Sequence, residues 1–187
     1  MQEPFAEVLH AWHDFYLLAG TASATLLGLM FVAASIGASV FTEKHRAPMR
    51  AFLSPTSVHF SAVLLLCLLA APPWPSAFSL AIALAVSGAA GTIYSARVAA
   101  DIFIRGHFHI DIADRAFYGV IPLIGHLLVV AAAILLFTRH AAGLEVFAAA
   151  LMALLAASIR NAWDMMVWIV IRVPVPAGEE PTRNPDG

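Results

Sequence analysis

The sequence predicts an all-α protein: a five-helix transmembrane bundle with an N-terminal interfacial amphipathic helix. The first observation is composition, because 61% of the 187 residues are hydrophobic and only 12% are charged, whereas soluble domains average about 45–50% and about 25%. The second is that the apolar residues form blocks of 19 or more, the length that crosses a hydrocarbon core of roughly 30 Å. A soluble amphipathic helix would instead show polar residues every three or four positions.

Residues 1–14 are expected to form the interfacial helix. Apolar residues recur there at spacings of three and four, and polar residues fill the other face: Phe5, Val8, Leu9 and Trp12 against Glu3, Glu7, His10, His13 and Asp14. Tryptophan favours the headgroup level of a bilayer. The segment has no Lys or Arg, unlike a secretory signal, so we expect the first apolar block to stay in the mature protein.

One membrane domain is predicted over residues 15–172, with spans at 15–41, 53–71, 76–100, 117–137 and 144–171. Pro55 is placed in the first turn of the second span, where its missing N–H costs nothing. The Pro-Pro-Trp-Pro sequence at 72–75 predicts a tight turn. Residues 173–187 hold four prolines and two glycines, which predicts a disordered cytoplasmic tail.

The basic residues predict the orientation of the bundle. With five spans, one side carries eight of them and the other only Arg139: the eight are Lys44, Arg46, Arg50, Arg97, Arg105, Arg115, Arg172 and Arg183. Because Lys and Arg concentrate in cytoplasmic loops, we expect the N-terminus outside and the C-terminus in the cytoplasm.

The first span carries a stripe of small and hydroxyl residues at helical spacing: Gly20, Thr21, Ala24, Thr25, Gly28, Ser35 and Ser39. Such a face lets membrane helices approach closely, and it can also line a polar pathway. Packing inside the bundle is the favoured interpretation. Matched depth then predicts that the Ser35–Ser39 end meets His59, Arg160 and Asp164.

The predicted topology gathers ionisable side chains near the cytoplasmic side: His59, Arg97, Asp101, Asp114, Arg115, Arg160, Asn161 and Asp164. Arg97 and Asp101 are four residues apart, as are Arg160 and Asp164, so each pair shares a helix face. The cluster is either an ion- or proton-binding vestibule or a girdle of salt bridges between helices. The girdle is favoured, because charges near membrane boundaries usually anchor.

His126 is the ionisable residue nearest the predicted midplane, about 14 Å into the fourth span. It is a candidate for proton relay, metal binding or haem ligation, and a hydrogen bond to a neighbouring helix is the simpler interpretation. A haem with two axial histidines needs a partner at equal depth. His59 is estimated to lie about 5 Å shallower, so no cofactor is expected.

Two other groups of polar residues favour solvated surfaces over metal sites: Glu7, His10, His13 and Asp14, and His107, His109 and Asp111. Neither group has the matched second cluster that a di-iron or zinc centre uses, so no metal site is expected. The net charge of −2 gives no indication of nucleic-acid binding. No hydrolase, phosphate-loop or dinucleotide motif occurs in the sequence, so an enzyme is not favoured.

Three phrases together resemble a known group of proteins: GTASATLLGLMFVAASI at 20–36, DRAFYGVIP at 114–122 and IRNAWDMMVW at 159–168. They are similar to small polytopic inner-membrane proteins of bacteria, a family with no established activity. The resemblance implies this architecture and a bacterial inner (plasma) membrane location, and it implies no mechanism.

Three functions are therefore weighed, all with the lipid bilayer as surroundings. The first is an oligomeric channel for ions or small solutes, in which the first span of each copy of a homo-oligomer faces a shared axis. The second is a scaffold or accessory subunit that binds another membrane protein. The third is a membrane-embedded redox or metal-binding protein.

Overall fold

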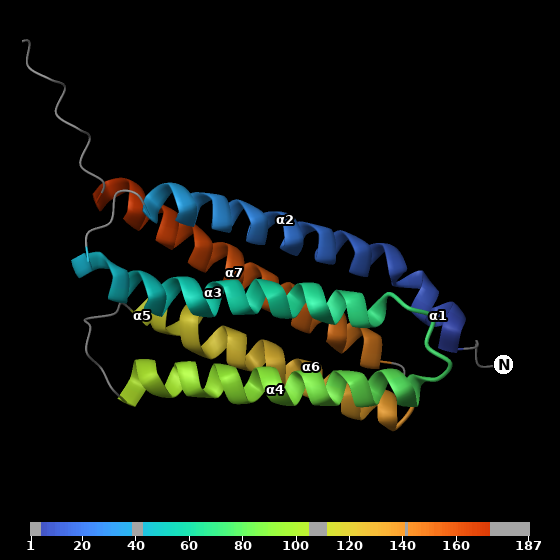
Figure 1. The fold of residues 1–187 in the computed structure, drawn as a ribbon. Helices are drawn as coiled ribbons and strands as arrows, with labels where there is room; N and C mark the ends of the chain where they lie inside the picture. Colours follow the sequence, from blue (N-terminus) through green and yellow to red (C-terminus); the bar gives the residue numbers. More distant parts are fainter. Residues whose placement is uncertain (1–4, 39–42, 105–111, 141, 173–187) are drawn as a thin grey trace, which may run out of the picture.

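The computed structural model describes residues 5–38, 43–104, 112–140 and 142–172. Within these ranges the chain is helical apart from short turns, and they contain no strand, so the all-α class is confirmed. The elements, labelled in Figure 1, are α1 (Phe5–Ala11), α2 (His13–Ala38), α3 (Glu43–Ala70), α4 (Ala77–Ile104), α5 (Ile112–Arg115), the π-helix η1 (Ala116–Val120), α6 (Ile121–Phe137) and α7 (Gly143–Arg172).

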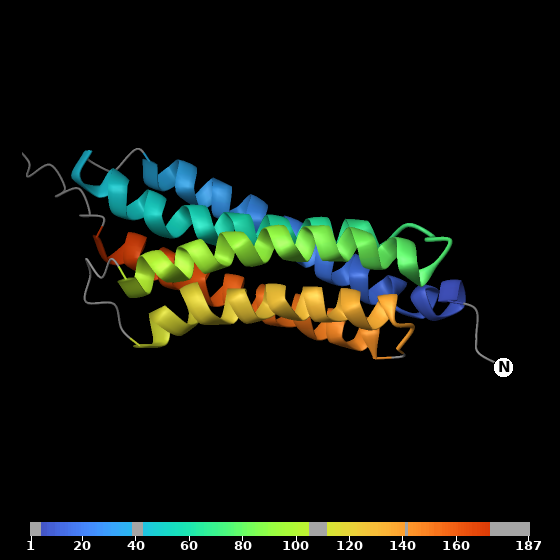
Figure 2. The ribbon, with the colours of Figure 1, turned by 90° about the horizontal axis from the view of Figure 1, so that it is seen from below.

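The long helices run antiparallel to their neighbours along the chain (Figures 1 and 2). Helices α3, α4, α6 and α7 pack in a ring, and α2 lies outside the ring against α3 and α7. One end of the bundle holds the turn between α3 and α4 and is called the Trp74 end. The opposite end, where α4 ends and η1 begins, is called the Arg160 end.

Four helical segments are long and apolar enough to cross a membrane: His13–Ser35, Ala77–Ile104, Ala116–Phe137 and Gly143–Val167. Many of their large apolar side chains point outward, among them Leu18, Phe31 and Trp163. Such a surface suits lipid and not water, so this is a multi-pass integral membrane protein. The apolar part of α3, Ser54–Ala70, is shorter, and its role as a fifth span stays a prediction.

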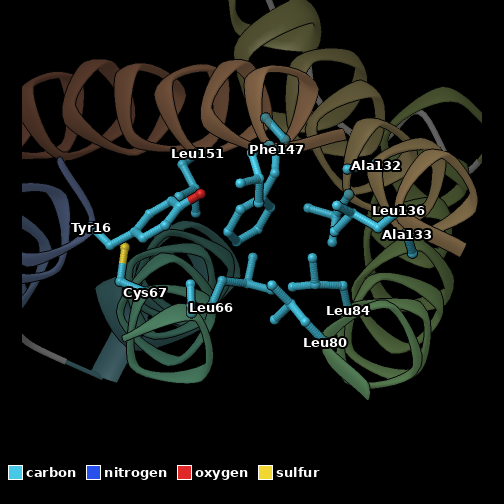
Figure 3. Packing of buried hydrophobic residues seen from close by; sticks show 14 of the residues in the cluster. Tyr16, Leu66, Cys67, Leu80, Leu84, Ala132, Ala133, Leu136, Phe147 and Leu151 are labelled. Carbon is cyan, nitrogen blue, oxygen red and sulfur yellow. The ribbon is translucent and has the colours of Figure 1, made fainter. Parts of the chain in front are cut away.

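The large apolar core fills the half of the bundle at the Trp74 end. Figure 3 shows the Phe147 ring of α7 at its centre, between leucines of α3 and α4 and the inward face of α6. Phe147, Leu80, Leu84 and Val129 have no exposed surface. This close-packed layer seals the interior of the protomer at that end.

Helix α1 caps the same end. Leu9 is buried, and Phe5 and Val8 pack against the apolar core. The apolar side of this helix, predicted from the spacing of its residues, therefore faces the bundle. Residence at a membrane interface stays a prediction for this helix.

Helix α3 begins much earlier than expected, at Glu43. Residues 43–52 lie between the first two predicted spans, so the sequence predicts a loop there, and the structure shows that this is wrong. Charges keep this segment out of an apolar span, but Glu, Lys, Arg, Ala and Met all favour helix. Pro55 consequently lies well inside the helix. The prediction that it stands in the first turn was wrong.

The helix ends at the other connections differ by smaller amounts. Helix α4 continues to Ile104 instead of ending at residue 100, so Asp101 is helical. The helix expected over 117–137 starts as the π-helix η1 and becomes α-helical only at Ile121, and the short helix α5 lies before it, between the third and fourth predicted spans. The tail at 173–187 and the end of the first predicted span, 39–41, lie outside the described residues.

Candidate functional site

Two histidines from different helices meet in the interior of the bundle. The ring centroids of His59 on α3 and His126 on α6 are 5.7 Å apart, with the rings inclined at 41°. Their exposed fractions are 1% and 2%. The ring of Tyr94 on α4 stands edge-on to His59 at 5.9 Å. Three helices therefore contribute aromatic polar groups to one layer, here called the histidine layer.

The depth estimate that separated the two histidines was wrong. It counted from the start of each predicted span, and the start of the second span was set at residue 53 although α3 begins at Glu43. Counted from the Trp74 end, His59 and His126 each lie eleven residues before the last residue of their helix. Equal rise per residue then brings them to similar heights.

Gly91 on α4 makes the room for His126. A Cβ atom built on Gly91 would lie 2.2 Å from Nδ1 of His126 and 2.4 Å from its Cε1. The Nδ1 edge of the imidazole therefore packs directly on the backbone of α4. Any side chain at this position would push the ring away, so Nε2 is the nitrogen of His126 that is left for a ligand.

Three ring nitrogens of the histidine layer lack hydrogen-bond partners among the described residues: both of His59 and Nδ1 of His126. On α4 the buried hydroxyls of Thr92 and Ser95 also lack a partner there, whereas the Tyr94 hydroxyl bonds with Ser54. Buried polar groups in proteins are nearly always hydrogen-bonded, and leaving one without a partner in an apolar setting costs several kcal/mol. Such groups on three adjoining helices therefore make this layer an unusual polar feature of the bundle interior.

A second polar cluster lies nearer the Arg160 end. Arg160 on α7 forms ion pairs with Asp164, one turn further on, and with Asp114 of α5 at 3.8 Å. Its guanidinium also lies 5.4 Å from the centroid of the Phe117 ring. The three charged side chains remain about one-third exposed. The cluster thus links α5 and η1 to α7.

Asn161, fully buried beside Arg160, explains how the bundle holds the π-helix. In η1 the N–H of Ile121 bonds to the carbonyl of Ala116, five residues back. The next residue, Pro122, has no N–H to give to the Phe117 carbonyl. The Asn161 side chain donates to that carbonyl instead, at 3.0 Å. In return the hydroxyl of Tyr118 donates to the Asn161 carbonyl, also at 3.0 Å.

The other members of the predicted cytoplasmic cluster are placed differently. Arg97 and Asp101 lie exposed on α4. Arg115 is half-buried, and its Nε has no hydrogen-bond partner among the described residues. Of the predicted cluster, the structure thus brings together Asp114, Arg160, Asn161 and Asp164. His59 belongs to the separate histidine layer.

The stripe on α2 mostly faces away from the bundle. Thr21, Ala24, Thr25, Gly28 and Ser35 are exposed, and only Gly20 is buried, against Cys67. The hydroxyls of Thr25 and Ser35 donate to carbonyls of their own helix. The expected meeting of Ser35 with His59 and Arg160 is not seen, and Ser39 lies outside the described residues.

Several residues of these sites were not singled out from the sequence. Ser23 joins α2 to α3 by donating to the Phe60 carbonyl at 2.8 Å. Gly91 and Ser95 are one helical turn apart, with Thr92 and Tyr94 between them. Small and hydroxyl residues at this spacing in an apolar block were the available indication of a polar helix face.

Of the two surface groups considered for metals, the group of Glu7, His10, His13 and Asp14 lies within the described residues. The rings of His10 and His13 stand 6.0 Å apart. No group of three or more His, Cys, Asp or Glu side chains suited to a metal ion occurs in the part of the chain that the structure describes. His107, His109 and Asp111 lie outside that part.

An open cleft of about 820 Å³ lies at the Trp74 end. It is lined by Phe5 and Val8 of α1, the start of α4, the end of α6 and the residues that follow it, including Arg139 and His140. The apolar core lies between this cleft and the histidine layer, so the two are separate features.

Comparison with protein-family models, with curated proteins and with solved structures finds no match to this chain. The fold and the polar layers define the class of protein: an all-helical, multi-pass integral membrane protein with buried polar groups between its helices.

Proposed function

We propose that the protein binds a transition-metal ion or a metal-containing cofactor between His59 and His126, within the membrane. One observation carries the proposal. Two imidazoles from different helices lie with their ring centroids 5.7 Å apart and are almost fully buried, and both ring nitrogens of His59 have no hydrogen-bond partner among the described residues. Of the three functions weighed from the sequence, this is the one that the geometry supports best.

The separation of the rings fits a shared ion. Metal–imidazole bonds are about 2.0–2.1 Å long, so two imidazoles on one ion have centroids about 5 to 6.5 Å apart, depending on the angle at the metal. The observed 5.7 Å falls inside this range. Imidazole is a common ligand of zinc, copper, iron and nickel.

The two ends of the bundle differ beyond the histidine layer. The apolar core closes the interior at the Trp74 end, whereas the polar side chains of Asn161 and Arg160 lie nearer the other end. We therefore propose entry from the Arg160 end. In the orientation predicted from the basic residues, this end faces the cytoplasm of a bacterial inner membrane.

Elemental analysis and visible spectroscopy of the detergent-purified protein test the proposal. Protein saturated with each candidate metal or with haem should retain about one equivalent per chain after desalting. His59→Gln and His126→Gln should each lose it. His140→Gln is the matched control, because this histidine is exposed outside the bundle core. Retention of the ligand by both layer variants would overturn the assignment, as would its absence from the wild-type protein.

A second candidate function is the oligomeric channel. It is favoured by the outward exposure of hydroxyl and small residues on α2, which places them where a second copy of the chain can face them: Thr21, Ala24, Thr25, Gly28 and Ser35. Liposomes containing the protein should then pass ions. Thr25→Leu should lower the ion flux, while Thr138→Val, just after the end of α6, should leave it unchanged.

Cross-linking that recovers one dominant partner, a different membrane protein, would favour the scaffold function instead.

A further inference from the structure

We propose that the cleft at the Trp74 end is a binding site for one anionic phospholipid, whose phosphate pairs with Arg139 and whose acyl chains lie on the apolar walls. The apolar core separates this cleft from the histidine layer, so the inference goes beyond the proposed function and does not depend on it. It comes from the walls of the cleft, its charge, its depth in the membrane and the backbone at Arg139.

The walls of the cleft are mostly apolar. Phe5 and Val8 of α1 line it, as do Phe78 of α4 and Phe137 of α6. The Phe78 and Phe137 rings are in contact, with centroids 5.1 Å apart, and about half of each residue's surface is exposed. The volume of about 820 Å³ falls within the range of roughly 300–1,000 Å³ that small-ligand sites have. The walls therefore suit a hydrocarbon chain.

The charge in the cleft is positive. Arg139 and His140 line it, and no Asp or Glu of the described residues does. Glu7 of α1 and Glu145 of α7 are exposed and do not belong to the lining. The ion pairs found among the described residues do not include Arg139. A guanidinium presents N–H donors in a fork that matches a phosphate, so a ligand with apolar chains and a phosphate complements the cleft.

The depth of the cleft favours a lipid over a soluble anion. The apolar span Ala77–Ile104 starts at the cleft, and the span Ala116–Phe137 ends there. The ends of such spans mark the edge of the hydrocarbon core. Arg139 follows the last residue of the second span by two positions, which places it at the level of the headgroup phosphates.

The backbone at Arg139 is one that glycine fits better than arginine. The N–H groups of Arg139 and His140 bond to the carbonyls of Leu136 and Leu135, which is the Schellman motif that ends many helices. The φ angle of Arg139 is 56°, in the left-handed region that glycine adopts at this position without steric cost. A larger residue held in this conformation beside a cleft points to a function of its side chain.

Native mass spectrometry of the full-length protein, delipidated in detergent, tests the site. The probe is a short-chain phosphatidylglycerol, and the comparisons are phosphatidylcholine with the same acyl chains and inorganic phosphate. Wild-type protein should bind one phosphatidylglycerol per chain, more tightly than either comparison. Arg139→Gly should weaken this binding by about 10- to 100-fold, because a hydrogen bond between charged groups is lost.

Two controls separate the loss of the charge from a loss of the fold. Arg97→Gln is the matched variant, because Arg97 is an exposed cation on α4 outside the cleft, and it should leave phosphatidylglycerol binding unchanged. Arg139→Gly should melt at the same temperature as the wild type or higher, since glycine fits the backbone. If this variant fails to fold, Arg139→Asn takes its place, because asparagine also tolerates the left-handed region.

Four results would overturn the site. The first is phosphatidylglycerol binding that is unchanged in both Arg139 variants. The second is equally tight binding of phosphatidylcholine, which carries no net charge, and the third is equally tight binding of inorganic phosphate, which has no use for apolar walls. The fourth is a lipid-free dimer that dissociates in Phe137→Ser, since a second copy of the chain would then cover the cleft. None of these results depends on whether the histidine layer holds a metal, so the two proposals fail separately.

Discussion

Replacement of Gly91 by alanine is a direct test of how the histidine layer is packed. The added Cβ would lie 2.2, 2.4 and 2.7 Å from Nδ1, Cε1 and Cγ of His126, all shorter than normal contact. The ring must then rotate out of its position or α4 must move away from α6. Overpacking of this kind costs about 1–3 kcal/mol.

Gly28→Ala is the matched control for that experiment. Gly28 also lies inside a long helix, and a Cβ built there has no atom within 4 Å outside its own helix turn. Both substitutions gain the same helix propensity, about 0.5–1 kcal/mol for alanine over glycine. The difference between the two variants therefore isolates the overpacking at His126.

The assay is reversible unfolding in mixed detergent micelles, followed by helical circular dichroism. Gly28→Ala should be as stable as the wild type or slightly more stable. Gly91→Ala should be less stable than Gly28→Ala by about 1–3 kcal/mol, and it should lose the ligand of the layer. Equal stability of the two variants, with the ligand retained, would refute the placement of His126 against α4.

Two hydrogen bonds between helices give further predictions. Asn161→Leu leaves the Phe117 carbonyl without its side-chain donor and should destabilise the bundle by about 1–3 kcal/mol. An unchanged free energy of unfolding would show that this hydrogen bond does not stabilise the π-helix. Ser23→Ala loses the bond to the Phe60 carbonyl and should cost about 0.5–1.5 kcal/mol. The hydroxyl of Thr25 bonds only within its own helix, so Thr25→Ala should lower the stability less than Ser23→Ala does. A larger loss of stability in Thr25→Ala than in Ser23→Ala would contradict the contact between α2 and α3.

Most of the fold could be predicted, because a membrane helix can be recognised from the composition of its segment. Blocks of apolar residues with few charges have one main structural solution in lipid, the helix with all its backbone groups bonded internally. The ends of the helices were harder to predict. Charges show where a segment leaves the apolar core, and Glu43 shows that a helix can continue beyond that point.

The candidate site could be predicted only in part, because the depth of a residue in the bundle has to be counted from a helix end whose position the sequence does not define well. Arg160 and Asp164 are four residues apart on one helix, so their pairing follows from local geometry alone. The meeting of His59 and His126 depends on where two separate helices begin and end, and an error of several residues at one end shifts the estimated depth by many ångströms. Counting from the tight turn at 72–75, the better-defined end of α3, would have brought them together.

The two polar layers are mechanically connected through α6. Asp114 and Tyr118, which contact α7 through Arg160 and Asn161, lie before or within η1, and His126 lies one turn after Pro122. A π-turn contains one residue more than an α-turn, and one residue in an α-helix corresponds to a rotation of about 100°. If η1 were a regular α-turn, either Tyr118 would leave α7 or His126 would leave α3. The clamp of Asn161 on the Phe117 carbonyl therefore fixes the direction in which His126 points, although Asn161 lies in the other layer.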